Sequence, residues 1–234
     1  MGNIDDLQIP DSVKRSLRPF LLRQIANSPI LDIYEIELFD WYIKETETLL
    51  SGMLSSERAF IQEQVQSGTE DINDTGMLAV EYYLKRVRYS HVIYIASLLE
   101  IFLERSCVRL EEILGKQNLP FTTADLKGNQ WVVRKKFLER YGHFSIPEPI
   151  WSDIQALIKL RNNIVHDNGD TSALNEEEKH MLSKRNGIKV SGYEVVIEAN
   201  YIHSALETIK STVQFVEKEI GVIVDRSIQP RSVD

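Results

Sequence analysis

The chain has 234 residues and a net charge of −8, with 43% hydrophobic and 26% charged residues. These values are typical of a soluble globular protein that can bury a sizeable core, and the acidity argues against a general nucleic-acid coat protein. One cysteine, Cys107, excludes an internal disulfide framework and fits a reducing, cytoplasmic compartment. The most apolar run, residues 91–103, is interrupted by Glu100 and is too short to span a bilayer, so no membrane partner is expected.

The first third of the chain carries the acidity. Residues 1–75 hold 6 Lys and Arg against 14 Asp and Glu, whereas residues 76–234 hold 21 of each kind. Apolar residues recur there at the helical period, which predicts a short helix over residues 13–25 and a long one over residues 36–65. We therefore expect residues 1–75 to form an acidic helical N-terminal extension.

The longest helical pattern follows, over residues 77–114, and Gly115 is placed to end it. After a loop around Pro120, the pattern predicts a short helix over residues 131–141 and another that starts near Pro149 and continues to His166. Two basic clusters lie in these helices and could steer RNA phosphates, although a solvated helix face is the simpler explanation of each of them. The clusters are Lys85-Arg86-Val87-Arg88 and Arg134-Lys135-Lys136, with Arg140 one turn further on.

Past the fifth helix, residues 168–187 are polar and indicate a loop or a short exposed helix. Residues 188–197 alternate in polarity around a central Ser-Gly, which predicts a β-hairpin. Asn200 is a candidate cap for a last helix that ends near Val224, before a flexible tail over residues 225–234.

These elements predict an all-α fold, a helical bundle with one minor β-hairpin. Residues 76–224 would form the main helical domain, with the helix over residues 80–114 packed against the helix over residues 150–166.

The most unusual stretch closes that second core helix. Between Leu160 and Gly169 it places a guanidinium (Arg161), neighbouring carboxamides (Asn162 first) and an imidazole (His166) within six residues. Arg is suited to gripping a phosphate through its planar fork, and His can take or give a proton near neutral pH. Asn162 and His166 are four apart and share a helix face, which Arg161 can reach from the side. A plain helix C-terminus ending at Gly169 would use similar residues.

The spacing of Arg and His alone is weak evidence, because the same Arg-x4-His pattern also occurs at Arg86 and His91. There the Arg is followed by Val87, and the pattern lies inside a long helical run rather than at a helix end. We therefore expect His91 to be dispensable for any activity.

The segment from Leu160 to Gly169 resembles the signature of the HEPN superfamily (higher eukaryotes and prokaryotes nucleotide-binding), an Arg with a polar neighbour, a spacer and a His at the end of a core helix. Residues 97–104 resemble the first core helix of that family, and the likeness, nearest to stand-alone RiboL-PSP and MAE-type members, covers roughly residues 76–222. Residues 1–75 gain nothing from it.

This resemblance implies a metal-independent endoribonuclease, a toxin or phage-defence effector, that cuts RNA by attack of the 2′-OH. Arg161 would hold the phosphate, Asn162 would orient His166 or the phosphate, and His166 would be the general acid or base. It further implies a homodimer that brings two copies of the motif to a twofold axis, and a possible antitoxin partner. No cofactor and no metal are expected.

Two other interpretations stay open. In the first, the same residues bind nucleotide, RNA or a partner without catalysis. In the second, the motif is accidental in a helical interaction protein, and Arg161 and His166 would then form separate salt bridges on an exposed surface.

Overall fold

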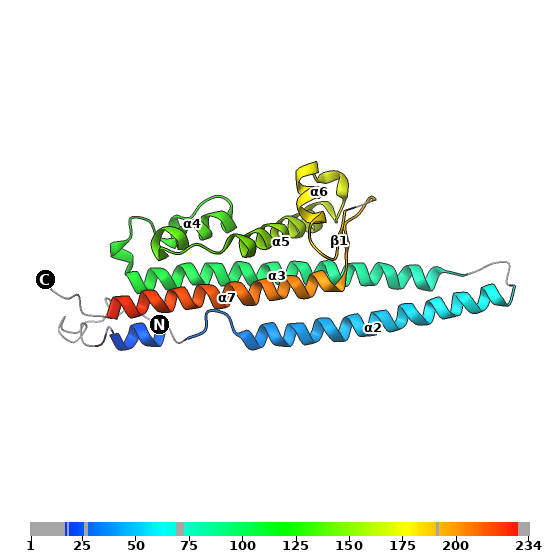
Figure 1. Cartoon of the computed structure of the whole chain (residues 1–234), viewed down its shortest axis with the longest axis horizontal. Coiled ribbons are helices and arrows are strands. Elements are labelled where there is room, and N and C mark those ends of the chain that lie inside the picture. Colours follow the sequence, from blue (N-terminus) through cyan, green and yellow to red (C-terminus); the bar gives the residue numbers. More distant parts are fainter. Residues whose placement is uncertain (1–16, 18, 26–27, 69–72, 191, 229–234) are drawn as a thin grey trace. The chain divides into compact units, whose positions relative to one another are not determined.

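The computed structural model describes residues 17, 19–25, 28–68, 73–190 and 192–228. Helices make up most of these residues and pack as a bundle, and one small antiparallel hairpin accompanies them (Figure 1). The predicted all-α bundle with a minor β-hairpin is therefore confirmed.

Helices begin and end close to the residues that periodicity and chain breakers predicted. Gly115, with φ of 82°, ends the longest helix, and its N–H donates to Glu111 O at 2.9 Å. The helices are α2 (Ile33–Gln66), α3 (Thr75–Leu114), α4 (Gln130–Gly142), α5 (Glu148–Asp167), α6 (Glu176–Ser183) and α7 (Ala199–Ile228), with single turns at η2 (Lys116–Asn118), η3 (Thr123–Asp125) and η4 (Thr171–Ala173). Residues 19–25 are also helical, and the start of the predicted first helix lies outside the described residues.

The C-terminal part decides one open expectation and departs from another. The polar stretch after α5 contains the short helix α6, one of the two predicted alternatives, and Asn175 and Glu178 make a reciprocal capping box at its start. Helix α7 begins at Ala199, so Asn200 lies in the first turn rather than at the cap, and the helix continues to Ile228, past the predicted end at Val224. Residues 229–234, most of the predicted tail, lie outside the described residues.

The predicted hairpin consists of β1 (Ile188–Lys189) and β2 (Val196–Ile197), which pair antiparallel. The register opposes Ile188 to Ile197 and Lys189 to Val196. Ile188 and Ile197 are buried whereas their neighbours are exposed, which is the alternation that the sequence predicted.

The chain divides into two compact units. Unit 1 comprises Leu98–Trp151 with the described parts of Met1–Asp32 and Lys210–Asp234, and unit 2 comprises Ile33–Ser97 and Ser152–Ile209. The boundary predicted at residue 75 is a different division of the chain, and it stays a prediction. Helix α2 and the Arg161 to His166 motif both belong to unit 2.

In unit 1, Cys107 is 1% exposed and burial raises its thiol pKa to about 12. The prediction that Cys107 is a core residue is confirmed. Among the described residues, no helix is both long and apolar enough to cross a membrane.

In unit 2, α2 packs against α3 and α7 through its inward side. Ile36 and Ile43 are fully buried there, and Phe39 stacks at a tilt on Tyr94 with ring centroids 4.2 Å apart. Within this unit, Figure 1 places α5 over α3 on the side opposite to α2. The motif therefore lies on one side of the unit and α2 on the other.

Candidate functional site

The motif occupies the last two turns of α5. Leu160 and Ile164 are buried and anchor these turns, whereas Arg161 and Asn162 are partly exposed and His166 is exposed. The alternation follows from the helical period, because positions four apart share a face. The chain therefore presents the three predicted site residues toward solvent from a buried support.

Arg161 Nη1 donates a hydrogen bond to Asn162 Oδ1 at 3.0 Å. Because Asn162 shares its helix face with His166, this bond draws the guanidinium toward the imidazole side of α5. The amide oxygen of Asn162 is used by Arg161, so among the described residues Asn162 orients the guanidinium rather than the His166 ring. The amide N–H groups of Asn162 remain available as donors.

No described acidic side chain forms an ion pair with Arg161 or with His166. Separate salt bridges at these two residues were the feature expected of an accidental motif, and the described residues do not provide them. The Arg161 guanidinium and the exposed His166 imidazole, which have no ion-pair partner among the described residues, can accept an anion without first breaking a salt bridge.

Asn163 differs from its neighbour Asn162 in burial, a difference that the sequence alone does not indicate. It is 2% exposed, and its Nδ2 donates to the carbonyl of Asp170 at 2.8 Å while its own carbonyl accepts from Gly169 N at 3.2 Å. Adjacent residues on a helix point about 100° apart, so one amide faces solvent and the next faces the core. Asn163 thus fixes the turn that ends α5.

That turn is held against α3 and the hairpin. Asn168 and Gly169 have φ of 55° and 82°, and a Cβ on Gly169 would lie 2.1 Å from Tyr89 Oη. Tyr89 is buried, its hydroxyl donates to Val195 O at 2.7 Å, and burial raises its pKa to about 12. Val195 N in turn donates to Gly169 O at 2.8 Å. Gly169 therefore does more than end a helix, since it admits the Tyr89 ring.

The basic side chains of the cluster at Lys85 to Arg88 bond to other residues of unit 2. Lys85 pairs with Glu194, and Arg86 donates to Asn168 Oδ1. The Arg88 guanidinium makes two bonds to the Glu47 carboxylate, at 2.8 and 2.7 Å, and one to Ile197 O. These side chains tie α3 to α2, to the end of α5 and to the hairpin, so neither sequence-based explanation of the cluster describes it.

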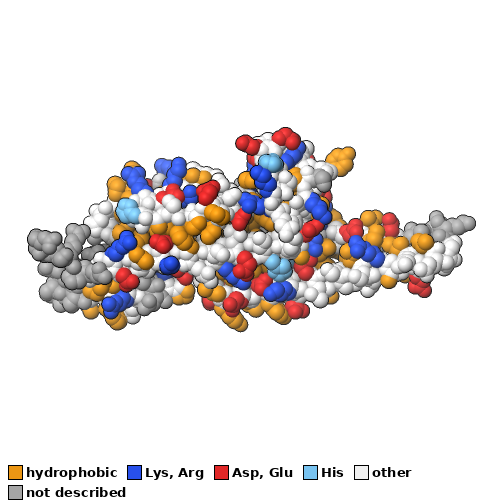
Figure 2. Space-filling model, viewed as in Figure 1, with side chains coloured by type: hydrophobic (Ala, Val, Ile, Leu, Met, Phe, Trp, Pro, Cys, Tyr) orange, Lys and Arg blue, Asp and Glu red, His pale blue; other side chains and the backbone are white. Residues whose placement is uncertain are grey.

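The second basic cluster is also partly internal. Arg134 is buried and bonds to Glu100 and Glu104, and Lys135 pairs with Glu139 at 2.9 Å. Lys136 is exposed. On the face drawn in Figure 2, basic and acidic side chains are interspersed. The basic surface that the sequence suggested for this cluster is therefore reduced mainly to Lys136 and to Arg140, which is also exposed.

His91 lies in the core rather than on a surface. It is 3% exposed and its ring meets those of Phe39 and Tyr42 edge-on, with centroids 5.6 Å apart in both cases. Neither ring nitrogen has a hydrogen-bond partner among the described residues. Burial lowers the pKa of His91 below its ordinary value. Arg86 and His91, the second Arg-x4-His match, therefore do not form a common site.

A pocket of about 200 Å³ lies elsewhere in unit 2, between α5, the end of α6 and α7, and is lined by Arg185 and Tyr201 among others. Arg161, Asn162 and His166 do not line it, so the motif is an open surface rather than a wall of this pocket. Within the described part of the chain, no three His, Cys, Asp or Glu side chains are close enough to hold a metal ion.

Comparison of the chain with protein-family models, with curated proteins and with solved structures finds no match.

Proposed function

We propose that the exposed end of α5 is the active surface of a HEPN-type endoribonuclease that cuts RNA without a metal ion. The observation that supports this most directly is the bond from Arg161 to Asn162, because Asn162 and His166 are four apart and share a face of α5. The resemblance of this segment to the HEPN signature supplies the reaction class.

The chemistry needs few groups, because RNA carries its own nucleophile. The 2′-oxygen attacks phosphorus, the bond from phosphorus to the 5′-oxygen breaks, and the products are a 2′,3′-cyclic phosphate and a 5′-OH. One proton leaves the 2′-OH and one joins the departing 5′-oxygen. His166 carries out one of these transfers, and water or a second imidazole carries out the other.

Arg161 and Asn162 handle the phosphate. The pentacoordinate transition state gathers extra negative charge on the non-bridging oxygens, and a guanidinium stabilises that charge through paired N–H donors. Asn162 holds Arg161 in place through its amide oxygen and offers its amide N–H groups to the same phosphate.

The test incubates purified protein with mixed RNA in excess EDTA, and with one RNA that carries a 2′-deoxy sugar at the scissile position. We expect cutting of the RNA, no cutting of the deoxy substrate, and a loss of about 10² to 10⁴ in rate for His166→Ala. His180→Ala, which removes an exposed His on α6, is the matched control and should retain the rate.

Dependence on added Mg²⁺, or cutting at the deoxy position, would refute this mechanism. RNA binding without cleavage, lost in Arg161→Ala, would replace it by the non-catalytic binding interpretation.

A further inference from the structure

A pocket of unit 2 lies between α5, α7 and the segment that follows α6, and it is called here the Tyr201 pocket. Its volume is about 200 Å³. The lining residues on α5 are four apart and the polar ones on α7 are three apart, so each helix turns one face to the pocket. Its lining includes Asp153, Leu157, Lys184, Asn186, Tyr201 and Ser204.

Tyr201 places an unpaired hydroxyl at this pocket. The residue is 5% exposed and lines the pocket, and its hydroxyl has no hydrogen-bond partner among the described residues. Burial raises the pKa of Tyr201 above its ordinary value, so the hydroxyl keeps its proton at neutral pH. Buried hydroxyls are normally hydrogen-bonded, so this one indicates an acceptor that the described residues do not supply.

The charges around the pocket favour an anion. Of its lining residues only Asp153 is acidic, and the Arg185 guanidinium neutralises it through a contact of 2.5 Å. A second nitrogen of Arg185 donates to Ser152 Oγ at 2.6 Å, and its Nε is buried without a hydrogen-bond partner among the described residues. Lys184 forms no ion pair with a described residue. Two cations therefore accompany one carboxylate, which leaves the lining with one positive charge in excess.

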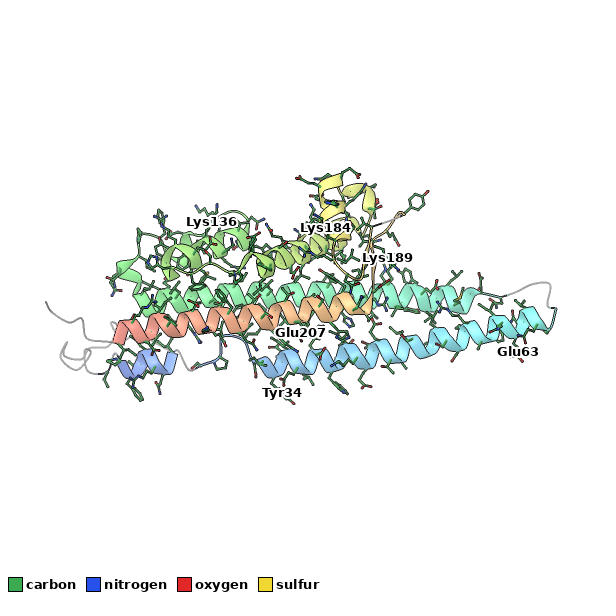
Figure 3. The ribbon with its side chains drawn as sticks, viewed as in Figure 1. Tyr34, Glu63, Lys136, Lys184, Lys189 and Glu207 are labelled. Atoms are coloured by element: carbon green, nitrogen blue, oxygen red, sulfur yellow. The ribbon has the colours of Figure 1, made fainter. Side chains whose placement is uncertain are left out.

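Two further donors and an apolar wall complete the pocket. The Asn186 amide and the Ser204 hydroxyl have no hydrogen-bond partner among the described residues, whereas Leu157 contributes an apolar side chain. In Figure 3, Lys184 lies at the end of α6, and Glu207 lies on the edge of α7 away from it. The pocket thus has hydrogen-bond donors on the α6 and α7 sides and an apolar wall on α5.

The size of the pocket limits the ligand. About 200 Å³ is several times the roughly 30 Å³ of one water molecule, and it is below the roughly 300–1,000 Å³ of sites for drug-sized ligands. Donors on two sides suit the tetrahedral oxygens of phosphate better than the two coplanar oxygens of a carboxylate, and hydrogen bonds to a charged acceptor are the strong ones. A phosphate group with a short carbon chain fits this volume, whereas a nucleotide does not.

We propose that the Tyr201 pocket binds a small phosphate monoester. The phosphate accepts hydrogen bonds from Lys184, Tyr201 and Ser204, and the short carbon chain lies against Leu157 and Ala205. The three residues of the α5 motif do not line this pocket, so the two sites are separate. The proposal does not depend on the nuclease activity.

The first test is equilibrium dialysis of the full chain against radiolabelled glycerol 3-phosphate, a monoester with three carbons. We expect one molecule per chain with a dissociation constant of about 1 mM or lower. Inorganic phosphate should compete about tenfold more weakly, because it leaves the apolar wall uncovered. AMP should not compete, because it exceeds the volume of the pocket. No saturable binding in the millimolar range would overturn the proposal, and competition by AMP as strong as that by unlabelled glycerol 3-phosphate would overturn the size argument on which it rests.

The second test assigns the binding to the pocket. Tyr201→Phe removes one oxygen and keeps the packing of the ring, so it should fold and weaken binding by about 10 to 100-fold. Lys184→Ala should weaken binding by about tenfold. The matched controls are Tyr193→Phe and Lys136→Ala, which change exposed residues outside the pocket and should bind like the native chain. Arg161→Ala should also bind normally. Loss of binding in Arg161→Ala with full binding in Tyr201→Phe would place the phosphate on the α5 motif and refute the proposal.

Discussion

The Tyr89 hydroxyl occupies the space that a side chain on Gly169 would need. A Cβ at position 169 would lie 2.1 Å from Tyr89 Oη and 2.7 Å from Cζ, and Gly169 also has a φ of 82°. The ring cannot withdraw cheaply, because its hydroxyl is bonded to Val195 O inside the core. The turn that ends the candidate site thus depends on a contact between residues 80 positions apart.

Gly169→Ala should therefore destabilise the protein by about 2–4 kcal/mol, the sum of left-handed backbone strain and the clash. Gly192→Ala is the matched control, since Gly192 has a φ of 92° but no atom within 4 Å of the place that a Cβ would take. It should show the strain alone, about 1 kcal/mol. Urea denaturation of both variants measures the difference, and equal losses would show that Tyr89 does not define the turn.

A second prediction concerns the ion pair between Arg88 and Glu47. Both side chains are largely buried, at 17% and 11% exposure, so Glu47→Ala leaves an uncompensated guanidinium and should cost about 2–4 kcal/mol. The double variant Glu47→Leu, Arg88→Met removes both charges and should recover most of the loss. Denaturant midpoints of the single and double variants provide the check. A double variant as unstable as the single one would mean that Arg88 acts mainly through Ile197 O.

The buried His91 makes stability depend on pH. Its pKa is lowered in the folded chain, chiefly by burial, while the unfolded chain titrates near the ordinary value of 6.5. Above that pH both states are neutral at this residue. As the pH falls below it, the unfolded chain takes up a proton first, so the free energy of unfolding should decrease.

His91→Phe should reduce this decrease between pH 7 and 5, because it removes the titrating imidazole. The phenyl ring can still pack against the aromatic neighbours of His91. His180→Ala, which removes an exposed imidazole, is the control and should keep the slope of the native chain. If RNA cleavage is found, His91→Phe should also retain most of it. An unchanged slope in His91→Phe would show that other groups carry the pH dependence.

The fourth prediction concerns Asn162 as a positioning residue. Asn162→Ala frees the Arg161 guanidinium and should lower kcat/KM for RNA cleavage by about 10 to 100-fold at unchanged melting temperature. Asn162→Asp should be worse and act mainly on KM, because a carboxylate beside Arg161 competes with the phosphate. Gln155→Ala, an exposed amide two turns earlier on α5, is the control. Equal effects of Ala and Asp would argue that Asn162 does not act through Arg161.

Local signals determined most of the secondary structure. Three signals depend only on residues that are close together in the chain, so each predicts its element from the local sequence alone. They are the apolar period of α2 and α3, the helix end at Gly115 and the alternation around Ser191-Gly192. The same is true of the candidate site as a list of residues, since Arg161, Asn162 and His166 lie within six positions on one helix.

Only the tertiary structure decided what those residues contact. Asn162 and Asn163 are identical neighbours, but the fold gives them different partners. Asn162 accepts a hydrogen bond from Arg161, whereas Asn163 is buried and donates to the backbone of Asp170. The cluster at Lys85 to Arg88 looked like a surface for phosphates, but its partners Glu47, Asn168 and Glu194 are 41 to 109 residues away. Which face of α2 is covered was equally hidden. Pairing over such separations depends on how the helices pack, and a period along one helix carries no information about that.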